Sequence, residues 1–215
     1  MYERRLRCAA APDIVLLAAG MSRRFGSPKL AAEAGGRTLL ERAVEQLAAL
    51  GMHRLIVVVG PGFANDLPVL PSAGATVVRN AAPAEGLASS IRVGLREVGR
   101  QAEAVLLCLA DQVALTTTDY RQLIEQWRVR PQQPAAAFYR SQPGVPAIFP
   151  RSWFDDLNAL TGDRGAGVLL RSRAGEISGV PLPAAEFDVD TPADLERYRL
   201  AVGWIEANSA ARRPC

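Results

Sequence analysis

Histidine and cysteine are scarce in this chain of 215 residues, which has one histidine and three cysteines. Cys8, Cys108 and Cys215 are odd in number, lack CxxC spacing and have no histidine cluster near them. The sequence therefore supports neither a disulfide framework nor a zinc site, and a reducing cytosol fits its cysteine usage best. His53 opens a predicted strand far in sequence from every motif below, so we expect it to be structural or exposed.

Long apolar runs and a strong charge of one sign are also missing. No stretch approaches the roughly 18 uninterrupted apolar residues that a membrane span requires. The basic opening of the chain is similar to a secretory signal, but Pro12 and Asp13 interrupt the apolar run that follows it. The formal net charge is only +3 and the arginines form no single stripe, which argues against nucleic acid. We expect a soluble, cytoplasmic protein with no membrane or nucleic-acid partner.

Apolar residues make up 49% of the chain, which is enough for the core of one ordinary domain. Apolar runs of strand length alternate with helical patterns, and most of these runs show little polar alternation, as in strands buried on both faces. This order predicts an α/β fold with a mostly parallel sheet. The predicted strands are 14–17, 55–59, 76–78, 104–109, 135–138 and short pieces near 177–180, and the predicted helices are 38–50, 87–98, 119–127, 153–160 and 192 to about 207. We expect a turn at 130–134 and flexible termini at 1–12 and 208–215.

A basic loop, LLAAGMSRRFGSPKL at residues 16–30, follows the first predicted strand. Parallel α/β sheets bind ligands at the carboxyl ends of their strands, so this is where a phosphate site is expected. Gly20 lets the backbone approach a phosphate, Ser22 offers a hydroxyl, and Arg24 and Lys29 offer positive charge. The loop is neither a Walker A motif nor GxGxxG. Charge alone leaves open the alternative of a solvated basic connector.

The spacing within this loop resembles the signature of the nucleotidyltransferases, Leu-Ala-(Ala/Gly)-Gly-x-Ser-x-Arg-(Met)-Gly-x-x-Lys, with Phe25 in place of the methionine. The Ala-Ala-Gly form at 18–20 is similar to the cytidylyl branch of the molybdenum cofactor enzymes. NAAPAEGLASSIRVGL (80–95), GVPAIFP (144–150) and LTGDRGAGVLL (160–170) extend the likeness to the molybdenum cofactor cytidylyltransferases over residues 13–200. This resemblance implies one Rossmann-like, three-layer α/β/α nucleotidyltransferase domain, with a nucleotide-binding half at 13–112 and an acceptor-binding half at 113–200.

The resemblance also implies the binding residues. On the nucleotide side they are Leu17, Ala18, Ala19, Gly20, Ser22, Arg24, Lys29, Asn80, Gly86, Ser89 and Ser90. On the acceptor side they are Gly144, Pro146, Asp163, Arg164 and Gly165. Helix capping is the alternative explanation for Gly86 and Asp163. Arg164 is different, because a cation near a helix N-terminus opposes the helix dipole and calls for an anionic partner.

Two acidic segments complete the predicted site. Asp111 follows the predicted strand 104–109 and should stand beside the basic loop, where it would be a Mg²⁺ ligand; the alternative is a cap for the helix near Thr118. In DVDTPADL (188–195), helix initiation explains Thr191, Pro192 and Asp194 but neither Asp188 nor Asp190. The resemblance implies a metal ligand at Asp190, and Mg²⁺ is the expected cofactor.

No pairing of a nucleophile with a base is evident in the sequence. A phosphate monoester carries its own nucleophilic oxygen and needs no base, so this absence favours such an acceptor. The resemblance implies transfer of CMP from CTP to the terminal phosphate of molybdopterin cofactor, with release of pyrophosphate and with Arg24, Lys29 and Asp111 as catalytic residues. It also allows a transient contact with a molybdoenzyme or its chaperone. The alternatives are a guanylyl, isoprenoid-cytidylyl or sugar-phosphate nucleotidyltransferase, a non-catalytic nucleotide- or pterin-binding carrier, and an α/β domain of unrelated role.

Overall fold

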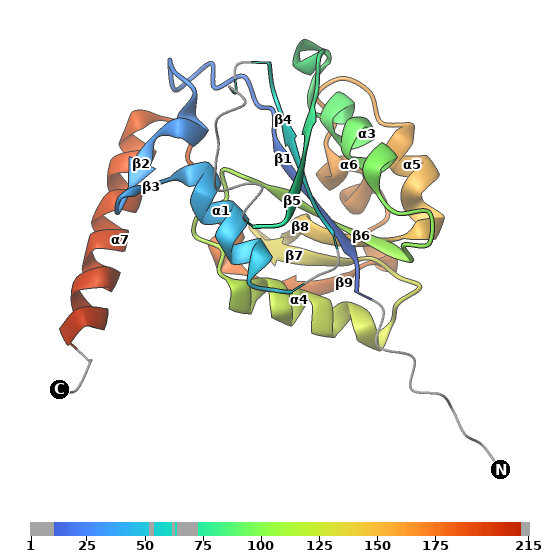
Figure 1. Ribbon diagram of the computed structural model, residues 1–215. Coiled ribbons are helices and arrows are strands. Elements are labelled where there is room, and N and C mark those ends of the chain that lie inside the picture. Colours follow the sequence, from blue (N-terminus) through green and yellow to red (C-terminus); the bar gives the residue numbers. More distant parts are fainter. Residues whose placement is uncertain (1–10, 52–53, 62, 64–72, 212–215) are drawn as a thin grey trace.

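A seven-stranded sheet runs through the centre of the computed structural model, which describes residues 11–51, 54–61, 63 and 73–211 (Figure 1). The strand order is β5-β4-β1-β6-β8-β7-β9. Neighbours from β5 to β6 pair in parallel, β8 is antiparallel to both β6 and β7, and β9 is parallel to β7. The strands are β1 (Asp13–Ala18), β4 (Leu55–Val59), β5 (Ala75–Arg79), β6 (Ala104–Leu109), β7 (Ala135–Tyr139), β8 (Gln142–Pro150) and β9 (Ser178–Pro181).

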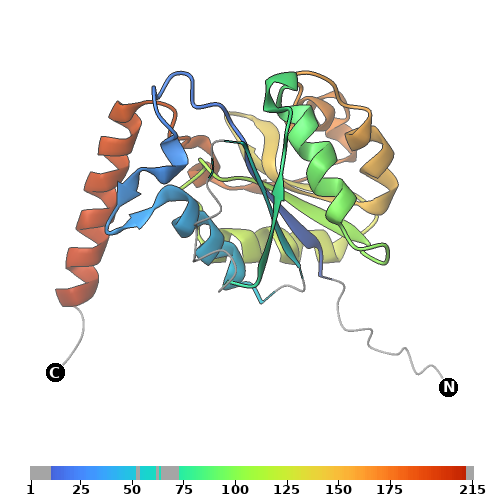
Figure 2. The same cartoon turned by 45° about the horizontal axis from the view of Figure 1, so that its top comes forward.

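Helices cover both faces of this sheet and make the three layers of an α/β/α fold (Figures 1 and 2). On one face lie α1 (Leu39–Ala48) and α4 (Thr117–Val129), and on the other lie α3 (Leu87–Glu97), α5 (Phe154–Asn158) and α6 (Ala166–Ser172). Strand β1 is buried from both sides: Ile14 and Leu16 pack toward α1, and Val15 and Leu17 pack toward α3. Burial on both faces explains why this strand is apolar throughout, and the predicted mostly parallel α/β fold is confirmed.

The last helix, α7 (Pro192–Ala211), lies at one side of the molecule beside the small hairpin of β2 (Glu33–Ala34) and β3 (Arg37–Thr38) (Figure 1). Arg199 Nε donates to the carbonyl of Glu33 at 2.8 Å. Short 3-10 helices complete the fold: η1 (Lys29–Ala31), η2 (Pro83–Glu85), η3 (Arg151–Trp153), η4 (Ala174–Glu176) and η5 (Pro183–Glu186). Within the described part of the chain, none of the helices is long and apolar enough to cross a membrane.

Three elements differ from the sequence predictions. Strand β8 was not predicted, because Pro143, Pro146 and Pro150 interrupt it and proline usually marks a loop or a strand edge. The helix predicted at 153–160 is shorter, since its first turn is η3 and α5 ends at Asn158. Helix α7 continues to Ala211, past the predicted end near residue 207. The expected turn at 130–134 does separate α4 from β7.

Some predictions made from the sequence fall outside the described residues. These concern His53, Cys8 and Cys215, and the termini at 1–10 and 212–215. Cys108 is the cysteine that the structure describes, and it is free and buried in β6. Burial raises the pKa of this thiol well above its ordinary value, so the thiol is a packing group rather than a nucleophile.

Candidate active site

The carboxyl ends of β1 and β6 lie side by side at one edge of the sheet. The two strands pair directly, with Leu17 opposite Leu109, and the Ala110 amide donates to the carbonyl of Leu17 at 3.1 Å. The basic loop leaves β1 at this point and Asp111 leaves β6. The predicted placement of Asp111 beside the basic loop is therefore confirmed.

Two cations and two acids from three segments form one cluster at this edge. Lys29 Nζ lies 2.7 Å from Asp111 Oδ2 and 2.9 Å from Asp190 Oδ1. Arg24 Nη2 lies 2.6 Å from Asp190 Oδ2. The Lys29 side chain is only 8% exposed, whereas that of Arg24 is 73% exposed. Lys29 is thus an interior cation that bridges both acids, and Arg24 covers the cluster from the solvent side.

Backbone hydrogen bonds hold the segments of this cluster in place. The amide of Val189 donates to the carbonyl of Asp111 at 3.1 Å, which fixes residues 188–190 against the end of β6. Within the basic loop, the Lys29 amide donates to Ser22 Oγ at 3.2 Å. The amides of Phe25 and Gly26 donate to the Ser22 carbonyl at 3.0 and 3.2 Å. The loop therefore turns back on itself at Ser22 and brings its cations over the strand ends.

The charges in and around this cluster shift several pKa values. Burial on its own would lower the pKa of Lys29, but the charges and hydrogen bonds of Asp111 and Asp190 outweigh it and raise that pKa. For Asp188, burial together with repulsion from the same two carboxylates raises the pKa to about 6. Hydrogen bonds from Thr191 and Arg197 instead hold the pKa of Asp194 well below its usual range. Lys29 is therefore a cation and Asp194 an anion at neutral pH.

Helix capping accounts for some of the acids and not for others. Asp194 Oδ2 accepts from the Thr191 amide at 2.8 Å and so starts α7, as the sequence predicts. The capping alternative for Asp111 is wrong, because Thr116 caps α4. The same alternative for Asp163 is also wrong, because Gly165 is the N-cap of α6 and no side chain caps it. Asp111 and Asp163 are thus left available for other roles.

The acidic pair suits a hard divalent cation. Asp111 Oδ1 is buried and has no hydrogen-bond partner, so one carboxylate oxygen in the cluster remains unsatisfied. Mg²⁺ takes oxygen ligands and commonly uses one or two carboxylates together with phosphate oxygens and water. Over the described residues, no group of three or more His, Cys, Asp or Glu side chains is arranged to hold a metal alone. The residues present therefore fit an ion that is held jointly with a phosphate ligand.

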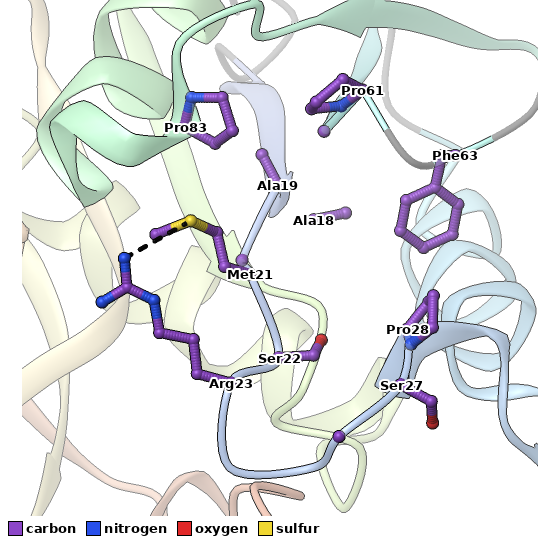
Figure 3. Close-up of a pocket in the computed structure, with 13 residues that line it drawn as sticks. Ala18, Ala19, Met21, Ser22, Arg23, Ser27, Pro28, Pro61, Phe63 and Pro83 are labelled. Carbon is purple, nitrogen blue, oxygen red and sulfur yellow. Dashed lines mark hydrogen bonds between the residues drawn. The ribbon is translucent and has the colours of Figure 1, made fainter.

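Three cavities surround the cluster. A cavity of about 630 Å³ beside the basic loop is mainly apolar, with Phe63 and Pro28 on one side and Met21 and Pro83 on the other (Figure 3). A smaller cavity of about 180 Å³ is lined by residues 17–21 and by Lys29, Asp111, Ser90 and Asp163. A polar cavity of about 600 Å³ is lined by Arg24, Arg140, Arg197, Asp188 and Asp190, among others. We call these the loop cavity, the small cavity and the polar cavity.

Asn80, Ser89 and Ser90 form a hydrogen-bonded group behind the small cavity. Asn80 Nδ2 donates to Ser89 Oγ at 2.8 Å and to Ser90 Oγ at 2.9 Å, and Asn80 Oδ1 accepts from the Ala82 amide at 3.0 Å. All three side chains are buried, and of the three only Ser90 lines the small cavity. Asn80 and Ser89 are thus placed to shape the loop between β5 and α3, and their binding of nucleotide stays a prediction.

The residues predicted on the acceptor side lie in two places. Gly144 and Pro146 belong to β8, where a Cβ on Gly144 would come within 2.5 Å of the Tyr139 hydroxyl. Asp163, Arg164 and Gly165 lie in the loop before α6, and only Asp163 lines the small cavity. Arg164 is exposed. Binding of an acceptor by these five residues also stays a prediction.

Sequence reasoning missed Gln112, Arg140 and Arg197. Gln112 is buried, and its Nε2 donates to the carbonyls of Val145 at 3.0 Å and Ala185 at 2.8 Å, which joins β8 to η5 beside the cluster. A lone amide among the apolar residues that follow Asp111 was the available signal. Arg140 and Arg197 enter the polar cavity from the β7–β8 turn and from α7, and no local motif marks either of them.

Comparison with known proteins agrees with this fold. Residues 14–177 match the family model described as the MobA-like NTP transferase domain. Nicotine blue oxidoreductase from Paenarthrobacter nicotinovorans is 28% identical over an alignment of 198 positions that covers 86% of this chain and 94% of that protein. The crystal structure of the Rv0371c homologue from Mycobacterium sp. strain JC1 is 29% identical with a TM-score of 0.73, covering 90% of this chain and 97% of that one. The manganese complex of Rv0371c from Mycobacterium tuberculosis H37Rv is 25% identical with a TM-score of 0.68, covering 88% and 97%.

Proposed function

This chain belongs to the family of MobA-like NTP transferase domains, and on that premise we propose that it transfers CMP from CTP to the terminal phosphate of molybdopterin cofactor and releases pyrophosphate. The observation that carries the proposal is the cluster in which Lys29 bridges Asp111 and Asp190 at the carboxyl ends of β1 and β6. Such an edge, with cations and acids in contact, is suited to a triphosphate and a divalent ion together.

In the proposed complex the triphosphate lies along the basic loop. The Gly20 backbone, where a Cβ would meet nothing within 4 Å, leaves open space for phosphate oxygens. Arg24 and Lys29 bind the phosphates that leave as pyrophosphate. Each contact at about 4 Å contributes on the order of 4 kcal/mol before desolvation, at an effective dielectric constant near 20. Catalysis then rests on positioning and on charge stabilisation in the transition state.

Asp111 and Asp190 would hold Mg²⁺. When bound, the ion neutralises developing charge on the phosphate oxygens. The manganese in the complex of the 25% identical neighbour supports a divalent cofactor for this fold. The unsatisfied Asp111 Oδ1 supports the choice of Asp111 as one of its ligands.

We place the acceptor in the polar cavity, although none of the five acceptor-side residues predicted from the sequence lines it. This cavity shares Arg24 and Asp190 with the charged cluster, whereas the small cavity shares Lys29 and Asp111 with it. The cluster thus stands between the small cavity, where the triphosphate would lie, and the polar cavity, where the acceptor would lie. In-line attack on the α-phosphate requires the two substrates to approach from opposite sides in this way. The division into a nucleotide-binding half at 13–112 and an acceptor-binding half at 113–200 is part of this proposal. Most residues around the polar cavity do come from the second half, with Arg24 the exception.

A single incubation series tests the reaction. The chain is given each of the four ribonucleoside triphosphates with Mg²⁺ and either molybdopterin cofactor or a sugar phosphate, and mass spectrometry identifies what forms alongside pyrophosphate. We expect the cytidylylated cofactor, with CTP preferred over GTP in direct competition. A guanylylated pterin or a nucleotidylated sugar would assign the chain to another branch of the family. Tight binding of CTP or cofactor without any product would indicate a carrier.

One relative is named as an oxidoreductase, so the test also includes an assay for redox activity. That relative is 28% identical, so a redox activity on the same fold is a competing expectation. The clustered cations and acids favour group transfer, since a hydride transfer does not call for a paired triphosphate and metal site. We expect no loss of colour when the chain is incubated with nicotine blue and NADH or NADPH. Bleaching of the dye, with no pyrophosphate formed in the first series, would overturn the proposed transfer.

A further inference from the structure

Lys29 is the only lysine in the chain, although lysine and arginine together number 25. The others of these 25 are all arginines, yet the residue that contacts both acids of the cluster, within the part of the chain that the structure describes, carries an ammonium group. The two side chains differ physically. Arginine presents a rigid fork that suits a fixed partner, whereas lysine carries a compact charge on a flexible stem and can change partners with little backbone movement.

The cluster is balanced in charge without any metal. Lys29 and Arg24 supply two positive charges, and Asp111 and Asp190 supply two negative ones. Lys29 Nζ is within 3 Å of an oxygen of each acid and its side chain is nearly buried, so solvent screens its charge only weakly. A divalent ion approaching the same two carboxylates would meet this ammonium at short range. An ion that binds both carboxylates would therefore compete with Lys29 for them.

The small cavity beside Lys29 offers room for a second partner of its ammonium group. Its backbone is fixed, because its amide donates to Ser22 Oγ and its carbonyl accepts from the Ala32 amide at 3.0 Å. Its side chain lines the small cavity together with Gly20 and Met21 of the basic loop. A phosphate chain in that cavity, which Asp190 does not line, would offer oxygens to Lys29. The side chain can then turn while the backbone stays in place.

We propose that Lys29 occupies the metal position of the ligand-free protein and moves to the triphosphate when the nucleotide binds, so that nucleotide and divalent metal bind with positive coupling. This inference rests on the proposed function and adds to it an order of events. Metal alone binds weakly, and the nucleotide opens the acidic pair to it. Because coupling between two ligands is reciprocal, the metal must strengthen nucleotide binding by the same factor.

The single lysine makes the movement observable. Protein made with ¹⁵N-lysine carries one labelled side-chain ammonium group, and its NMR signal reports on Lys29 alone. We expect the signal to stay unchanged with millimolar Mg²⁺, and to shift with a CTP analogue whose α,β-bridging oxygen is replaced by a methylene group, even without metal. A shift produced by Mg²⁺ alone and equal to that produced by the analogue would overturn the inference.

Binding of Mn²⁺, followed by its electron paramagnetic resonance signal, measures the coupling. For the wild-type chain we expect the analogue to tighten Mn²⁺ binding by about tenfold or more, within the range usual for coupled sites. The variants Lys29→Met and Lys29→Gln should both bind Mn²⁺ more tightly than wild type without nucleotide and should lose most of the coupling. Lys29→Gln keeps a hydrogen-bond donor, so agreement between the two variants assigns the effect to charge.

Two controls separate the possible failures. Lys29→Arg keeps the charge and should keep Mn²⁺ binding weak, and Arg173→Met removes an ion pair with Asp156 far from the site and should leave both affinities unchanged. If wild type and Lys29→Met bind Mn²⁺ equally without nucleotide, the inference is wrong whatever the chain transfers. If no triphosphate binds in any arm, the inference and the proposed function both fall. If coupling is present but no product forms, only the proposed function falls.

Discussion

Gly86 and Gly162 meet backbone to backbone, so closely that a Cβ on Gly86 would come within 2.3 Å of the Gly162 carbonyl carbon. The amide of Ala88 donates to the carbonyl of Gly162 at 3.1 Å. This contact joins the loop that starts α3 to the loop that precedes α6. Two segments that the sequence predicts on the nucleotide side and the acceptor side are thereby held together.

Gly86→Ala should destabilise the protein. Gly86 has φ of +91°, a backbone conformation that residues with a side chain rarely adopt. The methyl group of alanine would also collide with the backbone of Gly162, which could move only at a cost in free energy. We expect the free energy of unfolding to fall by about 1–3 kcal/mol, as measured by urea denaturation. Gly175→Ala is the matched control, because a Cβ there meets nothing within 4 Å, and it should change stability by less than about 0.5 kcal/mol. Equal stability of the two variants would contradict the contact.

Asp111→Asn should abolish metal-dependent turnover while the chain stays folded. The substitution removes one of the two acids that contact Lys29, but Asp190 still pairs with that ammonium at 2.9 Å. Pyrophosphate release gives the rate, and a cooperative thermal transition shows that the fold is kept. Asp155→Asn in α5 removes the same charge outside the cluster and should retain wild-type turnover. Wild-type rates in Asp111→Asn would remove Asp111 from the site.

Arg24→Ala should raise the activation free energy by roughly 3 kcal/mol and so slow turnover about 150-fold, because its guanidinium stabilises charge in the transition state. Because its side chain is 73% exposed, the loss of its ion pair with Asp190 should change the free energy of unfolding by about 1 kcal/mol or less. Initial rates over a range of CTP concentrations check the first expectation and urea denaturation the second. An increase in KM alone would show that Arg24 acts only in binding the ground state.

The stability of the ligand-free protein should depend on Asp188 in the mildly acidic range. Burial and the neighbouring carboxylates raise the pKa of Asp188 to about 6, from an ordinary value of 3.8 in the unfolded chain. The folded state therefore binds this proton more tightly, and the stabilising contribution of protonated Asp188 is lost as the pH rises from about 4 through 6. Urea denaturation across this range, without nucleotide or metal, should show a downward slope that Asp188→Asn reduces. An unchanged slope in that variant would contradict the assignment.

The sequence was most informative where one strand forms one continuous apolar run. Strands β1, β4 and β6 are buried on both faces, so their apolar residues stand together and end abruptly at the sheet edge. Since neighbouring parallel strands end at the same edge, the meeting of Lys29 with Asp111 could be predicted from position alone. The helix start at Thr191 could also be predicted, because capping depends on residues close together in sequence.

The rest of the site depends on contacts that no local pattern records. Arg140 reaches the polar cavity only because β8 inserts antiparallel between β6 and β7, and the prolines of β8 conceal it as a strand. The hydrogen bonds of Gln112 to Val145 and Ala185 span 33 and 73 residues. Asn80 has the residue type of a ligand-binding amide, yet the serines of α3 occupy its donor group. For Arg140, Gln112 and Asn80, burial and contacts between distant parts of the chain determine where the side chain lies, and the local sequence records neither.

A backbone hydrogen bond, from the Val189 amide to the Asp111 carbonyl, links the two acidic segments next to the charged cluster. Asp111 follows β6, whereas Asp190 belongs to the segment that leads into α7, so the two carboxylates come from distant parts of the chain. Their spacing therefore depends on a main-chain contact as well as on the acids themselves. A change that displaces the backbone at Val189 would separate the acids even though both carboxylates remain.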